Sequence, residues 1–294
     1  MATPGNSNTP GKKDRREAAR EKARQDREIE RKRTRRNRFF LQGGVGIAVI
    51  AIAAIVMLVI VNQPKPVELS TNQAGPANMI SDGLLLVGNT TTAVKTPAIK
   101  AGGKPVPTDP SKYSKTVNIV TYVDLQCPVC QAFEATNGAQ IKSWVDSGIA
   151  SVEIHPISIL DPSSLGNAYA TRAANAVACV ANDEPDKFYA VIQSLFENQP
   201  AEKTPGRSDA QILSVLKGAG ASSADITKCV TTQRFANWVA AGTSRVGSTP
   251  FPNTVTPSTL KGTPTVFVDG QQYTGAVDDA AAFASFVQGI AKAK

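Results

Sequence analysis

A pair of cysteines separated by two residues lies where an apolar run gives way to helix-compatible sequence. The apolar run is Val117-Asn118-Ile119-Val120-Thr121-Tyr122-Val123, and the segment after it is Asp124-Leu125-Gln126-Cys127-Pro128-Val129-Cys130. This order predicts a strand that delivers a Cys-x-x-Cys motif to the start of a helix. Unpaired backbone N–H groups and the positive end of the helix dipole meet at such a start, and both favour a thiolate.

The two cysteines of the motif are expected to have different roles. Cys127, at the helix start, is the candidate nucleophile, and Cys130 is close enough to attack a mixed disulfide on Cys127 and release the partner. Pro128 suits the first helical turn, where a backbone N–H would have no intrahelical acceptor. A zinc half-site or a structural disulfide would also use such a motif. The other two cysteines, Cys179 and Cys229, stand alone, however, and do not form a second close pair.

The basic charge of the chain is concentrated at its N-terminus. Residues 1–38 contain 14 Lys and Arg and 6 Asp and Glu, so they account for the whole formal net charge of +8. The rest of the chain is formally neutral and has no basic cluster with base-stacking aromatic residues. Nucleic acid is therefore not an expected partner.

An uncharged stretch of 23 residues, 39–61, follows this basic tail. At about 1.5 Å per residue it is long enough to cross a hydrocarbon core of roughly 30 Å, so we predict a single transmembrane helix. The basic residues in front of it predict a cytoplasmic tail, 1–38, and an extracytoplasmic remainder. A signal peptide is the alternative, because Thr34–Leu41 partly matches a twin-arginine signal. The length of the apolar run and the lack of a clear cleavage site favour an uncleaved anchor in the cell membrane.

Residues 62–115 are rich in Pro, Gly, Thr and Asn, apart from the short apolar run 83–88. We interpret them as an extracytoplasmic linker with one short strand that pairs with the edge of the next domain.

The globular pattern spans residues 116–294. The strand 117–123, a helix that ends near Gly148 and a strand over 151–156 predict a β-α-β unit with a parallel strand pair. Helical patterns dominate from about 162 to 247, with the first helix expected over 165–181, which indicates a helical insertion. A strand, an Asp-Gly turn and a return strand follow over 262–273, and a last helix is expected from Asp278. The predicted class is an α/β fold with an inserted helical domain.

Three further features of this region bear on function. Asp124 is a candidate proton acceptor for Cys130, or alternatively a residue that shapes the helix entry. His155 is the only histidine, and a structural role is more usual than catalysis for a lone histidine at a strand end. Cys179 and Cys229 lie on separate predicted helices, and four cysteines in an extracytoplasmic domain predict a disulfide between these two.

The segment Gly262-Thr263-Pro264-Thr265, together with the Cys-Pro-Val-Cys motif, resembles the DsbA-like branch of the thioredoxin superfamily. The membrane anchor and second disulfide are similar to those of actinobacterial members. The resemblance implies a thioredoxin-like fold and a cis bond before Pro264, next to Cys127. It also implies that Thr263 and Pro264 present backbone groups to an extended substrate chain, and that the proline keeps metal away from the thiols.

The resemblance further implies an enzyme, without a bound cofactor, that oxidises cysteine pairs in exported proteins. A quinone-linked membrane thiol oxidase, DsbB-like or VKOR-like, would recharge it. Pro128 and Val129 would tune the redox couple. Val129 stands where DsbA has a thiolate-stabilising histidine, so we expect a less oxidising couple. A reductase or isomerase, and a metal-binding or metallochaperone module that uses the two thiols, remain alternatives because sequence does not fix the redox direction.

Overall fold

The computed structural model describes Lys32 and residues 74–89, 92–113 and 115–293. Apart from Lys32, these residues belong to one compact unit, Pro64–Lys294. The predicted transmembrane helix 39–61 and the rest of the predicted cytoplasmic tail 1–38 lie outside the described residues. Of the helices that are described, none combines the length and the apolar character needed to cross a bilayer.

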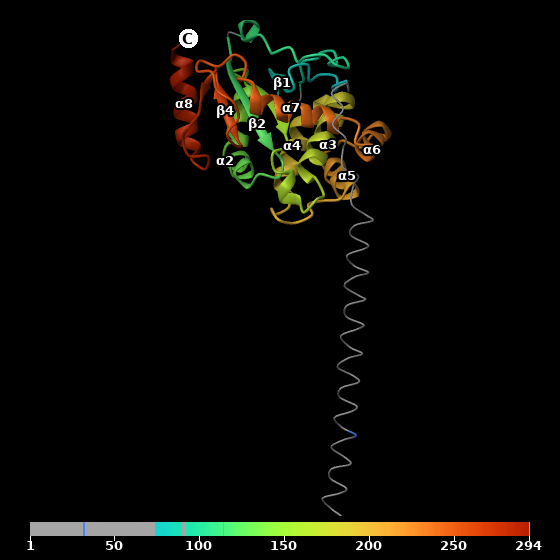
Figure 1. Cartoon of the computed structure of the whole chain (residues 1–294). Coiled ribbons are helices and arrows are strands. Elements are labelled where there is room, and N and C mark those ends of the chain that lie inside the picture. The colour runs from blue at the N-terminus through green and yellow to red at the C-terminus, as the bar shows by residue number, and fades with distance from the viewer. Residues whose placement is uncertain (1–31, 33–73, 90–91, 114, 294) are drawn as a thin grey trace, which may run out of the picture. The chain divides into compact units, whose positions relative to one another are not determined.

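Among the described residues, a five-stranded mixed sheet forms the centre of this unit, with the strand order β1-β3-β2-β4-β5. Figure 1 labels β1, β2 and β4. The strands are β1 (Leu84–Val87), β2 (Val117–Asp124), β3 (Ala150–Ile157), β4 (Thr265–Val268) and β5 (Gln271–Gln272). Strands β2 and β3 pair in parallel and are joined by helix α2 (Pro128–Asp146), which confirms the predicted β-α-β unit. The other strand pairs are antiparallel. The Asp-Gly turn joins β4 to β5 as predicted.

The helical insertion lies between β3 and β4, as predicted from the sequence (Figure 1). It comprises η2 (Asp161–Ser164), α3 (Tyr169–Asp183), η3 (Pro185–Lys187), α4 (Phe188–Glu197), α5 (Asp209–Gly218), α6 (Ala224–Thr231) and α7 (Ala236–Ser248). Ser208 and Ser223 cap α5 and α6 with their side chains, as serine commonly does at a helix start. After the sheet, α8 (Ala280–Lys292) is capped by Asp279, one residue after the expected start.

The first helix of the insertion begins later than the apolar pattern predicts. A helix from Leu165 was expected, but α3 starts at Tyr169 because Leu165 and Ala168 have φ angles of 51° and 46°, which are incompatible with a right-handed helix. The hydroxyl of Ser164 accepts a hydrogen bond from the Tyr169 N–H at 3.0 Å and satisfies one of the unpaired groups of the new helix start. Periodicity alone does not reveal such a turn.

Much of the segment expected to be a linker packs into the domain. Strand β1 pairs antiparallel with β3 at the sheet edge, as predicted, but Met79 and Ile99 outside that strand are also buried in the main core. The Asp82 carboxylate binds Arg245 at 2.6 Å and Trp238 at 3.0 Å, which fastens this segment to α7. The folded unit therefore starts well before the expected boundary at residue 116. Composition did not show this because the buried apolar residues are widely spaced.

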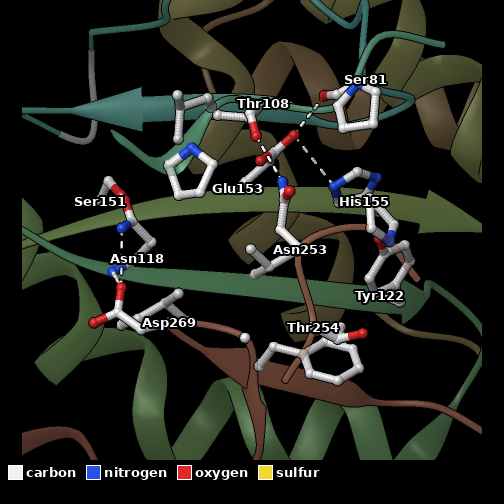
Figure 2. Close-up of a pocket in the computed structure, with 18 of the residues that line it drawn as sticks. Ser81, Thr108, Asn118, Tyr122, Ser151, Glu153, His155, Asn253, Thr254 and Asp269 are labelled. Carbon is white, nitrogen blue, oxygen red and sulfur yellow. Dashed lines mark hydrogen bonds and ion pairs between the residues drawn. The ribbon is translucent and has the colours of Figure 1, made fainter. Parts of the chain in front are cut away.

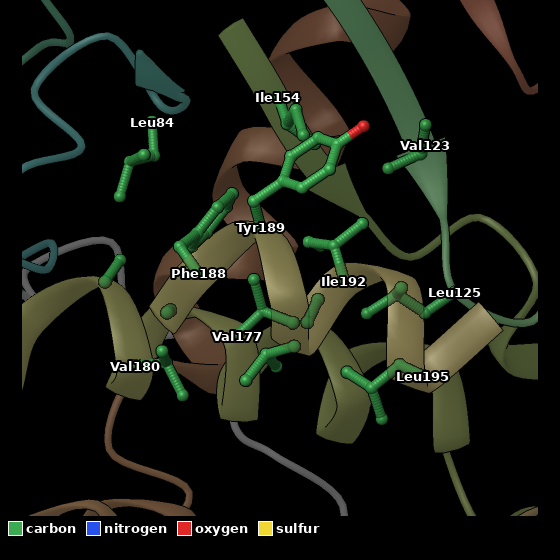
Figure 3. Close-up of a cluster of buried hydrophobic side chains, with 14 of the residues drawn as sticks. Leu84, Val123, Leu125, Ile154, Val177, Val180, Phe188, Tyr189, Ile192 and Leu195 are labelled. Carbon is green, nitrogen blue, oxygen red and sulfur yellow. The ribbon is translucent and has the colours of Figure 1, made fainter. Parts of the chain in front are cut away.

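The two faces of the sheet carry separate hydrophobic clusters. Side chains such as Val123 on β2 and Ile154 on β3 face α3 and α4 in the main core, which Figure 3 shows with Val177 and Ile192. A smaller cluster on the other face contains Tyr122, Ile157, Phe251 and Phe267. The alternation within β2 thus divides its side chains between two differently covered faces.

Candidate functional site

The Cys-x-x-Cys motif lies at the junction of β2 and α2, as predicted. Cys127 is the N-cap residue of α2, with an extended backbone and no side-chain cap, and Pro128 occupies the first turn. Pro128 and Val129 are exposed, whereas Cys127 and Cys130 are only 5% and 1% exposed. Both cysteines are free thiols in this structure. The Cys127 sulfur therefore faces unpaired N–H groups at the helix start, with little water to compete.

The loop before β4 lies directly against this motif. The Thr263–Pro264 peptide bond is cis, as the resemblance predicted. The Cys127 thiol donates a hydrogen bond to the Thr263 carbonyl oxygen at 3.3 Å, across 136 residues of sequence. This contact places the Thr263–Pro264 backbone beside the sulfur of Cys127, where an extended peptide would have to lie to react.

The environment separates the pKa values of the two thiols. The neighbouring Cys130 thiol stabilises the Cys127 thiolate and, against the opposing effect of burial, lowers the pKa of Cys127 to about 6, with further help from Thr263 and the N–H groups of Cys130 and Val129. Burial, and then the adjacent Cys127 sulfur, raise the pKa of Cys130 well above its usual range. Cys127 is therefore the thiol that is ionised at neutral pH, which agrees with its predicted role as the nucleophile.

Asp124 is fully buried at the end of β2. Its carboxylate accepts hydrogen bonds from the Gln126 N–H at 2.8 Å and the Leu160 N–H at 2.9 Å, so it shapes the turn that leads into α2. Burial raises the pKa of Asp124 to about 7 despite these hydrogen bonds, and the Cys127 charge adds to the effect. The structure thus shows the helix-entry role directly. The raised pKa is also compatible with proton uptake near the thiols, so that role stays a prediction.

Three glutamine side chains hold the active-site loop, residues 125–127, and the start of α2 against the helical insertion. None of them was identified from the sequence. The first is Gln199, whose amide nitrogen donates to the Leu125 carbonyl at 3.1 Å and the Cys127 carbonyl at 3.0 Å. The second is Gln131, which donates to the Phe196 carbonyl at 2.7 Å. These amides tie α2 and its N-cap residue to the end of α4.

The third, Gln126, is fully buried and lies immediately before Cys127. Its amide nitrogen donates to the Ser163 carbonyl at 3.3 Å, and its amide oxygen accepts from the Ser164 hydroxyl at 2.8 Å. The only sequence signal for such a role was a polar residue directly before the Cys-x-x-Cys motif. Its partners lie 37 and 38 residues away, and no local pattern identifies them.

The two remaining cysteines form the predicted disulfide. Cys179 on α3 and Cys229 on α6 are bonded, with 50 residues between them in the sequence. Both are buried, so the bond braces the helical insertion from inside.

His155 has a structural environment on the sheet. Its ring stacks on Tyr122 with a centroid distance of 4.4 Å, and its Nε2 atom lies 3.3 Å from the Glu153 carboxylate. A Cβ atom at Gly83 would come within 2.7 Å of the ring, so the chain before β1 needs glycine to pack on this histidine. These contacts agree with the structural role expected for a lone histidine.

Comparison with known proteins identifies the family to which this chain belongs. Residues 111–288 match the family model described as Thioredoxin, which is more than half of the chain. The chain belongs to the thioredoxin superfamily, in its DsbA-like branch. The predicted thioredoxin-like fold with a helical insertion is thereby confirmed.

Solved structures with this fold include two mycobacterial proteins and one from Bacillus. The reduced disulfide bond oxidoreductase DsbG of Mycobacterium tuberculosis is 26% identical, with a TM-score of 0.50 over 59% of this chain and 77% of that one. Oxidised DsbA of M. tuberculosis is 23% identical, with a TM-score of 0.52 over 71% of this chain and 92% of that one. Oxidised BdbD of Bacillus subtilis is 16% identical, with a TM-score of 0.52 over 76% of this chain and 100% of that one. The last two similarities concern the fold alone.

Among curated proteins, the serine/threonine-protein kinase PknE of M. tuberculosis is 32% identical over 138 residues. The match covers 42% of this chain, which spans about a quarter (24%) of the kinase. The family, the similarity to DsbG and the paired thiols at the helix start define this chain as a protein thiol-disulfide oxidoreductase.

Proposed function

We propose that this oxidoreductase introduces disulfides into exported proteins on the outer side of the cell membrane. The observation that carries the proposal is the difference between the two thiols, because Cys127 has a pKa lowered to about 6 while the pKa of Cys130 is raised. The second support is the Thr263 carbonyl at 3.3 Å from the Cys127 sulfur, where the backbone of a substrate would be held.

The reaction consists of two thiol-disulfide exchanges. In the oxidised enzyme, a substrate thiolate attacks the Cys127 sulfur, a mixed disulfide forms and the Cys127–Cys130 bond breaks. Cys130 leaves as a thiolate and takes up a proton, which its raised pKa favours. The second substrate thiolate then attacks the substrate sulfur and expels Cys127. Two electrons have moved from the substrate to the enzyme, whose dithiol a membrane thiol oxidase linked to quinone would reoxidise.

The low pKa of Cys127 favours oxidation of the substrate over its reduction. A stabilised thiolate lowers the free energy of the reduced enzyme, and this makes the disulfide form a stronger oxidant. A thiolate is also a better leaving group when its pKa is low. Val129 is exposed and has no side-chain donor for the thiolate, so we expect a couple less oxidising than that of DsbA.

The location outside the cytoplasm is supported by the sequence and by the buried disulfide. The basic tail 1–38 and the apolar segment 39–61 predict a single-pass anchor with a cytoplasmic N-terminus. A stable Cys179–Cys229 disulfide is typical of oxidising compartments. Protease accessibility of the domain in intact cells, with and without disruption of the membrane, tests this placement.

The reduction potential of the Cys127–Cys130 couple, measured by equilibration with glutathione, tests the redox direction. We expect a value above about −200 mV but below the roughly −120 mV of DsbA, because the thiolate is stabilised by the site and not by a histidine in the motif. A value near the roughly −270 mV of thioredoxin would favour the reductase alternative instead. Tight stoichiometric binding of zinc or copper by the reduced domain would favour the metal-binding module.

The pH dependence of thiol alkylation is expected to reveal the low pKa of Cys127. With a pKa of about 6, roughly 90% of Cys127 is thiolate at pH 7, against about 1% for the ordinary value of 9.0. The rate of carboxamidomethylation of the reduced protein by iodoacetamide should therefore rise with a midpoint near pH 6. The matched variant Cys130→Ala should move the midpoint upward, because the Cys130 thiol is the main stabilising partner. A wild-type midpoint at pH 8 or above would contradict the assignment.

A further inference from the structure

A cavity of about 330 Å³ lies on the face of the sheet that carries Tyr122, away from the thiols in the main core. Strands β2, β3 and β4 form its floor, and the segments 107–111 and 252–254 contribute to its rim (Figure 2). The Asn253 side chain donates a hydrogen bond to the Thr108 carbonyl at 2.7 Å, which links the two rim segments. The exchange reaction described above leaves this cavity without a role.

The carboxylate on the cavity floor is paired within the protein. Glu153 accepts a hydrogen bond from the Ser81 hydroxyl, and its carboxylate lies 3.3 Å from His155 Nε2 (Figure 2). Burial disfavours ionisation, but the hydrogen bond and the charge of His155 outweigh it, so the pKa of Glu153 is lowered. The carboxylate is therefore ionised with His155 as its cationic partner. Because the two charges cancel, this pair offers no net charge to a ligand.

The second carboxylate of the cavity wall is also engaged by the protein. Asp269 accepts hydrogen bonds from the Asn118 backbone N–H at 3.0 Å and from the Asn118 side-chain amide at 2.9 Å. Among the described residues that line the cavity, none is Lys or Arg. An ion of either sign that entered this space would lose its water without gaining a free counter-charge, and such a transfer is costly.

Apolar groups form much of the remaining wall. Tyr122 and Phe267 contribute aromatic rings, and Leu85 and Val120 contribute aliphatic side chains. Aromatic rings pack favourably on a further ring in offset or edge-to-face arrangements. The wall therefore favours an uncharged ligand with an aromatic body.

One polar group of the wall, the Tyr122 hydroxyl, has no hydrogen-bond partner among the described residues. The Tyr122 side chain is only 3% exposed, and its ring is held by His155 and Phe251, with centroid distances of 4.4 and 4.5 Å. Burial raises the pKa of Tyr122, so the hydroxyl stays neutral and can donate or accept a hydrogen bond. A buried hydroxyl without a hydrogen bond costs free energy, which a ligand with a matching polar group would recover.

We propose that this cavity binds a small uncharged aromatic molecule that carries a hydrogen-bonding group such as a hydroxyl. The cavity volume lies at the lower end of the range of small-molecule sites, which suits a single ring with a short substituent. The apolar wall holds the ring, and the Tyr122 hydroxyl binds the polar group. This site is separate from the thiol site, and its ligand takes no part in the exchange reaction.

Three probes with the same ring but different charges test the selectivity. Binding of benzyl alcohol, benzylammonium and benzoate to the protein is followed by NMR shifts of the Asn118, Tyr122 and Thr254 amides. We expect the neutral alcohol to bind at least tenfold more tightly than either ion. Equal or stronger binding of one of the ions, or no binding of any probe, would overturn the proposal.

The variant Tyr122→Phe tests the hydrogen bond, because it removes the hydroxyl and keeps the ring. Affinity for benzyl alcohol should fall about fivefold, the size expected for one neutral hydrogen bond, while affinity for ethylbenzene, which has a methyl group in place of the hydroxyl, should not change. The free energy of unfolding, measured with urea, should not fall, since the hydroxyl has no partner in the fold. Unchanged affinity for benzyl alcohol, or an equal loss for both probes, would contradict the role of the hydroxyl.

The variant Thr254→Trp locates the binding within the cavity. Thr254 lies on the rim and outside the sheet, so a bulky side chain there should block benzyl alcohol and ethylbenzene alike by occupying the space. The rate of disulfide exchange at Cys127 serves as the control for folding in both variants. Unchanged binding of benzyl alcohol by a folded Thr254→Trp protein would show that the probe binds elsewhere.

Discussion

Replacement of Cys127 by serine is expected to abolish oxidation of thiol substrates, with a loss of at least about a thousandfold in turnover. The Cys127 sulfur is the one whose thiolate the site stabilises, and the one that lies beside the Thr263 carbonyl. A serine hydroxyl ionises far less readily than a thiol and forms no disulfide. The measurement is oxidation of a reduced model peptide with two cysteines, followed under multiple turnover.

The matched variant, Cys130→Ser, is expected to have a different defect from that of Cys127→Ser. Attack by Cys127 is retained while the internal thiol that resolves a mixed disulfide is lost, so covalent complexes with substrate proteins should accumulate. Non-reducing electrophoresis of cells that express each variant distinguishes the two. If Cys127→Ser trapped substrates and Cys130→Ser did not, the roles of the two cysteines would be reversed.

Loss of the disulfide in the helical insertion is the second large effect expected. Replacing both Cys179 and Cys229 by alanine should lower the free energy of unfolding by about 4 kcal/mol, because a bond that closes a loop of 50 residues restricts the unfolded chain. For a domain whose whole stability is typically about 5–15 kcal/mol, this is a large share. Urea unfolding of the oxidised proteins measures the difference.

A matched control removes the other pair of cysteines. The double variant Cys127→Ala and Cys130→Ala should lose far less stability, since a disulfide between residues 127 and 130 closes only a very short loop. Mild reduction should also open the active-site pair while the buried Cys179–Cys229 bond resists it. Four reactive thiols after such treatment would contradict a structural role for the bond in the insertion.

Local sequence signals predicted the parts of the site that depend on near neighbours. The strand-to-helix junction around Cys127 follows from hydrophobic periodicity and from Pro128 at the helix start, and both are properties of adjacent residues. The Thr263–Pro264 loop was placed by its resemblance to a family motif, and the Cys179–Cys229 pairing by the cysteine count. The order of these residues in the sequence was sufficient for prediction because each feature can adopt only a few structures.

Features that depend on contacts between residues far apart in the sequence were not predicted. The Gln199 amide reaches two carbonyls more than 70 residues away, and nothing near Gln199 in the sequence indicates this. The residues around Met79 were interpreted as a linker because they include few apolar side chains. That these side chains are buried is visible only in the folded structure.

Because of the glutamine contacts, the position of the active-site loop depends on the helical insertion. A shortened protein without residues 161–248 would retain the sheet, α2 and both cysteines in its sequence. It would nevertheless lose the Gln199 side chain and the Ser163 carbonyl that hold the loop from the outside. A grafted Cys-Pro-Val-Cys motif on a minimal scaffold should therefore not inherit the thiol reactivity of this protein. Engineering of this enzyme would have to treat the motif and the helical insertion as one transferable part.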